Sequence, residues 1–191
     1  MLATAFVLAL TLVAAVTDLL WNKIYNWNTY GGILAALALS VTCVAAEAAD
    51  PAAASRLRMW FGGLTLTESV GGLLACGLLM VVCCAFFPDI GGGDVKLLAM
   101  LGAWLGWQKG LEALLWTFVL AACFGLIGLI WKIGPLVAVG RSVRLIANKL
   151  RLVWFAPLSD DERKALKPPI FIAPSALAAV VIVEFGKAFG L

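Results

Sequence analysis

Long apolar runs separated by short polar stretches dominate the chain. Several runs approach the 20 or so residues that an α-helix needs to cross a hydrocarbon core of about 30 Å. The pattern predicts six membrane-spanning helices, of which the fourth is the shortest. Their ranges are about Leu2–Leu20, Tyr30–Ala49, Ser69–Phe87, Val95–Trp107, Leu111–Ile133 and Ile170–Phe189. We therefore expect an all-α integral membrane protein in which residues 1–191 form a single polytopic domain.

Composition agrees with this pattern and narrows the chemistry. Hydrophobic residues make up 63% of the chain and charged residues 13%, and the mean hydropathy of +1.03 exceeds what a water-soluble domain carries. The sequence has no histidine, which excludes Ser-His catalysis and His-ligated metal sites. All five cysteines fall within predicted spans and form no paired CxxC motifs, so we interpret them as buried apolar residues. Among the usual catalytic groups, the carboxylates of Asp and Glu remain as candidates. We expect no metal, no cofactor and no nucleic-acid partner.

The basic residues predict the orientation of the bundle, because Lys and Arg collect in cytoplasmic loops. An N-terminus outside the cell places ten of the fourteen Lys and Arg residues on the cytoplasmic side. No Lys or Arg precedes the first span, so we interpret it as a retained helix and not as a cleaved signal. We expect a multi-pass protein of the cell inner membrane, in contact with the lipid bilayer.

Seven of the ten basic residues on the cytoplasmic side lie in the loop from about Gly134 to Pro169. Its first part, from Val139 to Trp154, places apolar and basic residues on opposite sides of a helical wheel. This pattern fits a cytoplasmic amphipathic helix in the membrane interface, before the last span. A solvated basic loop is the alternative.

Two aspartates stand out against this apolar background. Asp18 lies near the cytoplasmic end of the first span, and Asp94 lies after the third span, two crossings further along the chain, so both face the same compartment. Ionisable groups at membrane depth are costly and are functional candidates for that reason. Two simpler interpretations remain open: Asp18 forms an interfacial ion pair with Lys23, and Asp94 caps a helix.

Asp94 directly follows three glycines, Gly91, Gly92 and Gly93. Glycines allow a backbone with positive φ and the close approach of another segment. Non-helical backbone at membrane depth survives where it is buried in protein or borders a wet cavity. Asp89, which lies just before the glycines, competes for the role of second carboxylate but also fits a solvated loop residue after Pro88.

If Asp18 and Asp94 approach each other, one proton is shared between them. The ionised member can then take a proton from a water molecule that attacks a peptide carbonyl, while the protonated member assists the carbonyl oxygen and later the leaving amine. This hypothesis is an intramembrane aspartyl protease. The alternatives are a small proton- or cation-coupled transporter that uses the same aspartates and a scaffold subunit without chemistry.

At these residues the chain resembles the type IV prepilin peptidase family, membrane aspartyl proteases of the GxGD class. The stretch from Gly91 to Asp94, followed by Val95-Lys96-Leu97, is similar to the second catalytic segment of that family. Asp18 followed by Lys23-Ile24-Tyr25-Asn26 is similar to the stretch around its first catalytic aspartate, although the family usually has proline where Tyr25 stands. The stretch from Pro168 to Leu177 is loosely similar to the proline-containing start of the family's last helix.

The resemblance implies a peptidase that removes the short basic leader from type IV prepilins or pilin-like precursors at the cytoplasmic membrane face. It implies the short form of the family, without the methyltransferase and zinc-binding domain. The implied catalytic residues are Asp18 and Asp94. The residues expected to shape the site or bind substrate are Gly91, Gly93, Lys96, Asp89 and Lys23.

A final pattern concerns assembly. Gly102 and Gly106 have the small-xxx-small spacing that favours close helix packing. The contact can lie within one chain or between two copies, as in a homodimer.

Overall fold

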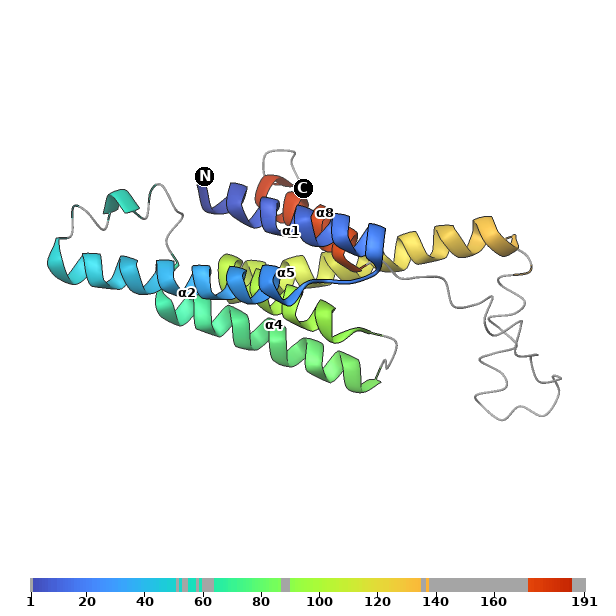
Figure 1. The fold of residues 1–191 in the computed structure, drawn as a ribbon, viewed down its shortest axis with the longest axis horizontal. Coiled ribbons are helices and arrows are strands. Elements are labelled where there is room, and N and C mark those ends of the chain that lie inside the picture. The colour runs from blue at the N-terminus through green and yellow to red at the C-terminus, as the bar shows by residue number, and fades with distance from the viewer. Residues whose placement is uncertain are drawn as a thin grey trace. The chain divides into compact units, whose positions relative to one another are not determined.

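The computed structural model describes residues 2–50, 52, 55–57, 59, 64–86, 90–134, 137 and 172–186. Within them the long elements are helices, shown in Figure 1: α1 (Leu2–Trp21), α2 (Asn26–Ala49), α4 (Leu66–Phe86), α5 (Gly92–Ile133) and α8 (Ile172–Phe185). The described part of the chain contains no strand, which confirms the predicted all-α fold. The predicted amphipathic segment before the last span, and Asp89, lie outside the described residues.

The chain divides into two compact units. The first comprises Met1–Leu120 and Ile172–Leu191, and the second comprises Ala121–Phe171. The first unit contains α1, α2, α4, α8 and α5 as far as Leu120. Both aspartates therefore belong to this unit.

Within the described part of the chain, four helices are long and apolar enough to cross a membrane: α1, α2, α4 and the stretch Gly92–Trp131 of α5. The first three lie within a few residues of predicted spans, whereas the full count of six crossings stays a prediction. The start of α2 differs most, because the helix begins at Asn26 and not at Tyr30. The first turn of α2 contains polar residues, and one of them packs against α1. Asn28 is buried, and its Nδ2 donates to the Leu10 carbonyl at 3.0 Å.

The element α5 is a helical hairpin and not one straight rod. A straight helix of its 42 residues would be about 60 Å long, twice the hydrocarbon thickness. The backbone leaves helical geometry at Gly106, with φ 77° and ψ 175°, a region open almost only to glycine. A Cβ added at Gly110 would lie 3.0 Å from the Gly102 Cα, which requires the chain to reverse between them. The chain thus reverses at Gly106, close to the boundary between the predicted fourth and fifth spans. That each arm crosses the membrane stays a prediction.

Glycines also bring α4 against the hairpin. A Cβ at Gly72 would collide with the Gly102 carbonyl, and one at Gly102 would collide with the Gly72 carbonyl. The two backbones therefore touch directly, as small residues allow in membrane helices. The predicted small-residue contact of Gly102 is thus used within the chain, and the homodimer stays untested.

Helix α8 packs along α1, and Figure 1 shows the two side by side. Both helices bury small residues. On α1 these include Val7, Thr11 and Ala14, and on α8 they include Ala173, Ala176 and Ala179. The pairing is antiparallel, because Thr4 at the start of α1 donates to Glu184 near the end of α8 at 2.9 Å.

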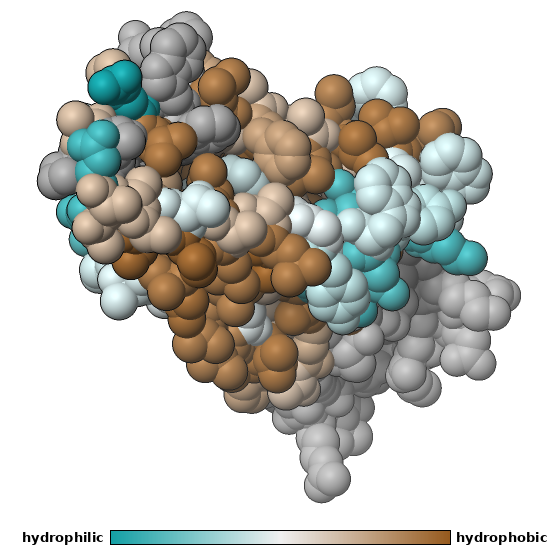
Figure 2. Space-filling model, turned by 60° about the vertical axis from the view of Figure 1, so that its left-hand side comes forward, coloured by the Kyte–Doolittle hydropathy of each residue, from teal (hydrophilic) through white to brown (hydrophobic). Residues whose placement is uncertain are grey.

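Charged residues of the first unit lie at two ends of the bundle. At one end lie Asp18, Asn26, Asp94 and Ala173, which we call the aspartate end. At the other, Glu184 accepts from Thr4 and pairs with Lys109 at 2.7 Å. Figure 2 shows hydrophobic residues over much of the surface of one face, with hydrophilic residues gathered in separate areas. Two acids thus meet at one end of an apolar bundle, as the count of crossings predicts.

Candidate active site

Asp94 lies in the first turn of α5. Its N–H donates to the Gly91 carbonyl at 3.1 Å, and its Oδ2 accepts from the Gly91 N–H at 3.2 Å. A carboxylate in this position satisfies a free amide and interacts favourably with the helix dipole. The capping interpretation is therefore correct, but it engages only Oδ2. Among the described residues Oδ1 has no hydrogen-bond partner, so capping leaves one oxygen of Asp94 open.

The glycines before Asp94 permit a close contact and do not provide an unusual backbone. The described glycines with positive φ are Gly106 and Gly134, so Gly91–Gly93 do not use the positive φ that glycine allows. The reason is that Gly92 and Gly93 already belong to the helix. The expected close approach is confirmed at Gly93, where an added Cβ would lie 3.1 Å from the Ile24 Cβ. The linker after α1 therefore passes directly over the first turn of α5.

Asp18 occupies the last turn of α1 and is half-buried. Its carboxylate accepts a hydrogen bond from the backbone N–H of Ala173. Ala173 is the second residue of α8, where the backbone amides have no partner within their own helix. The start of α8 thus holds the Asp18 carboxylate from a distant part of the chain.

Asp18 and Asp94 meet at the aspartate end from two different helices. The charge of Asp18 acts directly on the Asp94 carboxylate, so the two side chains are near enough to interact. Each is held by a backbone amide at a helix start, α8 for Asp18 and α5 for Asp94. Like charges at short range disfavour the ionisation of both groups, and a proton shared between Asp18 and Asp94 stays a prediction.

The two lysines expected at the site differ in their contacts. Lys23 is exposed, and within the described residues no ion pair joins it to Asp18. The simpler interpretation of Asp18 as a partner of Lys23 therefore gains no support. Lys96 instead reaches α2: its Nζ donates to Asn26 Oδ1 at 2.9 Å and lies 4.9 Å from the centre of the Tyr30 ring.

Comparison with known proteins agrees with this geometry. The chain matches the type IV leader peptidase family over residues 5–126, which include both aspartates. The chain belongs to this family. Membership in a leader peptidase family favours the protease hypothesis over a transporter or a scaffold.

Two curated proteins are similar to this chain in sequence. They are prepilin leader peptidase/N-methyltransferases of Burkholderia pseudomallei strains 1026b and K96243. Each is 32% identical over 106 residues, which cover 47% of this chain and 34% of the relative. The match therefore spans about a third of the relatives' length. No solved structure matches the chain.

Sequence reasoning missed three residues of this candidate site. Asn26 and Tyr30 hold Lys96, and Ala173 holds Asp18. Asn26 carries a signal, since it is a polar residue that directly precedes an apolar run. Ala173 carries none, because it acts through its backbone amide and its side chain resembles every other small residue of the last span.

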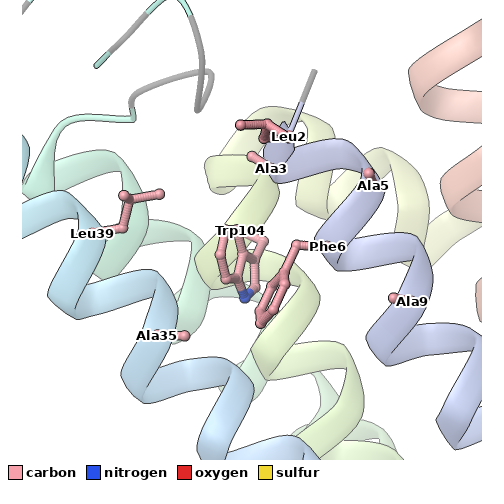
Figure 3. Close-up of a pocket in the computed structure, with 8 residues that line it drawn as sticks. All are labelled: Leu2, Ala3, Ala5, Phe6, Ala9, Ala35, Leu39 and Trp104. Carbon is pink, nitrogen blue, oxygen red and sulfur yellow. The ribbon is translucent and has the colours of Figure 1, made fainter.

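The structure also contains an apolar cavity of about 550 Å³, shown in Figure 3. Phe6 of α1, Leu39 of α2 and Trp104 of α5 line it, and the rings of Phe6 and Trp104 lie 5.2 Å apart. Its lining residue nearest in sequence to Asp18 is Ala9, about 13 Å away along α1 at the helical rise. The cavity therefore lies away from the aspartate pair and supplies none of the groups for the chemistry.

Proposed function

We propose that this protein is a membrane-embedded aspartyl endopeptidase. Its substrates are type IV prepilins or pilin-like precursors, from which it removes the short basic leader at the cytoplasmic face of the inner membrane. The observation that carries the proposal is the meeting of Asp18 and Asp94, from separate helices, at one end of an apolar bundle.

The proposed mechanism needs only the two carboxyl groups and one water molecule. The ionised carboxylate takes a proton from the water, whose oxygen attacks the carbonyl carbon of the scissile peptide. The protonated carboxyl group donates a hydrogen bond to the carbonyl oxygen, on which negative charge develops. The protonated carboxyl group then gives a proton to the amide nitrogen of the tetrahedral intermediate. The C–N bond breaks and the amine leaves.

The proposed orientation places the aspartate end in the cytoplasm. The supporting observation is the excess of Lys and Arg on that side when the N-terminus is outside. A basic leader on the cytoplasmic side would then meet the acid pair without crossing the bilayer. Asp89 is proposed as a further acidic contact for the leader because it precedes the glycines in sequence, and Lys23 as a residue at the rim of the site.

Co-expression with a pilin-like precursor tests the proposal. The parent enzyme should shorten the precursor, whereas Asp18→Asn and Asp94→Asn should each reduce the rate by about 100-fold or more, the usual contribution of a group that transfers protons. Each variant must also accumulate in the membrane at the parent level, so that lost folding is not mistaken for lost chemistry.

A matched control is Asp50→Asn. Asp50 is exposed at the far end of α2 from Asn26, so the same loss of a carboxylate should leave processing unchanged. Persistent processing in either Asp18→Asn or Asp94→Asn would remove that residue from the catalytic pair and with it the proposed mechanism.

A further inference from the structure

The linker between α1 and α2 fixes where Asp18 lies. It consists of Asn22–Tyr25 and begins where the Asn22 N–H donates to the Asp18 carbonyl at 2.9 Å. Asn22 has a positive φ of 50°, so the chain turns sharply after the last turn of α1. Any displacement of this short linker would therefore move the Asp18 backbone as well.

The first turns of α5 hold this linker and the start of α2 through three contacts. Gly93 packs against Ile24, with an added Cβ only 3.1 Å from the Ile24 Cβ. The Lys96 ammonium donates to Asn26 at 2.9 Å and lies over the Tyr30 ring at 4.9 Å. Asn26 and Tyr30 are one helical turn apart on α2, so Lys96 engages a single face of that helix.

The Lys96 ammonium carries a charge, and this charge strengthens both of its contacts with α2. A hydrogen bond from a charged donor exceeds a neutral one in strength, and an ammonium over an aromatic face adds a cation–π attraction. Neither aspartate is among these contacts, and the groups that act on the Asp94 carboxylate are Asp18 and Gly91, not Lys96. The ammonium thus contacts side chains of α2 and does not contact Asp18 or Asp94.

We propose that Lys96 is a positioning residue, which holds the turn that carries Asp94 against the linker that follows Asp18 and so sets the approach of the two carboxylates. Asn26 and Tyr30 are the groups on α2 that receive it. The inference rests on the proposed function only where peptidase activity is the readout, because the approach of the two positions can be measured without any substrate.

Cross-linking measures that approach directly. In a full-length chain whose native cysteines are replaced by alanine, Asp18→Cys and Asp94→Cys are joined by a short bifunctional thiol reagent in isolated membranes. Adding Lys96→Met should lower the cross-linking rate by about threefold to tenfold, because the hydrogen bond to Asn26 is exposed to solvent and contributes at the lower end of the usual range. Adding Lys96→Arg, which keeps a donor and a cation for the ring, should restore much of the rate.

Two variants of Tyr30, the aromatic partner of Lys96 on α2, test the same contact by cross-linking. Tyr30→Phe keeps the ring and should resemble the parent, whereas Tyr30→Leu should lower the rate. Lys109→Met removes a lysine that is also hydrogen-bonded, but to Glu184 at the opposite end, and should leave the cross-linking rate unchanged.

The two readouts separate the outcomes. In the chain with both aspartates, Lys96→Met should lower kcat for precursor cleavage while KM changes little. Cross-linking that falls without any precursor cleavage in the parent would support the positioning role and overturn the proposed function. Cross-linking that is unchanged by Lys96→Met, or absent in the parent pair, would overturn the positioning role.

Discussion

The Asp18 carboxylate accepts a hydrogen bond from the backbone amide of Ala173, although almost the whole chain separates the two residues. Through this contact the last described helix fixes an acid in the first one. The family match ends at residue 126, so the element that holds Asp18 lies beyond the region that identifies the family.

This relationship predicts the effect of Ala173→Pro. Proline lacks the N–H that Asp18 accepts and is tolerated in the first turn of a helix. Precursor processing should fall by about tenfold or more, because a hydrogen bond to a charged group contributes about 1.5–3 kcal/mol. The measurement is the rate of precursor shortening at matched enzyme levels.

Ala173 is fully buried, so the control must separate the added bulk from the lost amide. Ala173→Val adds similar volume and keeps the N–H. A loss of processing that is equal in the valine and proline variants would assign the effect to packing and contradict a role for the amide.

Hydropathy predicted the elements that are determined locally. α1, α2 and α4 follow apolar runs, and the shared end of Asp18 and Asp94 follows from counting crossings. Hydropathy failed at the start of α2, because Asn26 and Asn28 look like loop residues in sequence. In the fold one of them binds Lys96 and the other is buried against α1.

The contacts that complete the site could not be predicted because they join segments far apart in sequence. No pattern in the first span indicates that the start of α8 will donate an amide to Asp18. The role of Gly93 was predicted only in part: the close approach was expected, but its partner Ile24 was not.

The backbone of Tyr25 predicts a stabilising substitution. Its φ of −77° lies in the range that proline imposes, and within the described residues its N–H makes no hydrogen bond. Its side chain is exposed, so little packing is lost. Tyr25→Pro should raise the free energy of unfolding by about 0.4–1 kcal/mol through a more restricted unfolded chain, measured by thermal unfolding in detergent. A lower melting temperature would mean that the preceding Ile24 cannot adopt the conformation that proline demands.

Gly93 and Gly92 form a natural pair for testing the contact with the linker. A Cβ at Gly93 meets Ile24 at 3.1 Å, whereas one at Gly92 meets nothing within 4 Å. Gly93→Ala should push the linker away and lower processing by about threefold or more, as expected for overpacking of this size. Gly92→Ala should leave processing near the parent level. Equal rates for both variants would show that the linker can move aside without disturbing the aspartates.

Gly72 and Gly71 test the packing of α4 against the hairpin in the same way. A Cβ at Gly72 would collide with the Gly102 backbone, which cannot rotate away, whereas Gly71 faces open space. Gly72→Ala should destabilise the protein by about 1–3 kcal/mol, while Gly71→Ala should be neutral or slightly stabilising because alanine favours a helix. Thermal unfolding of the two variants at equal detergent concentration makes the comparison. Similar melting temperatures would be incompatible with direct backbone contact between the two helices.

The proposed orientation predicts which surface residues a membrane-impermeant maleimide can reach. Lys23 and Asp50 are both exposed and lie beside opposite ends of α2. In a chain without its native cysteines, Asp50→Cys should be labelled on intact cells, whereas Lys23→Cys should be labelled only after the inner face is opened. The reason is that the excess of basic residues retains the aspartate end in the cytoplasm. The reverse labelling pattern would place the acid pair outside, where a leader that stays in the cytoplasm could not reach it.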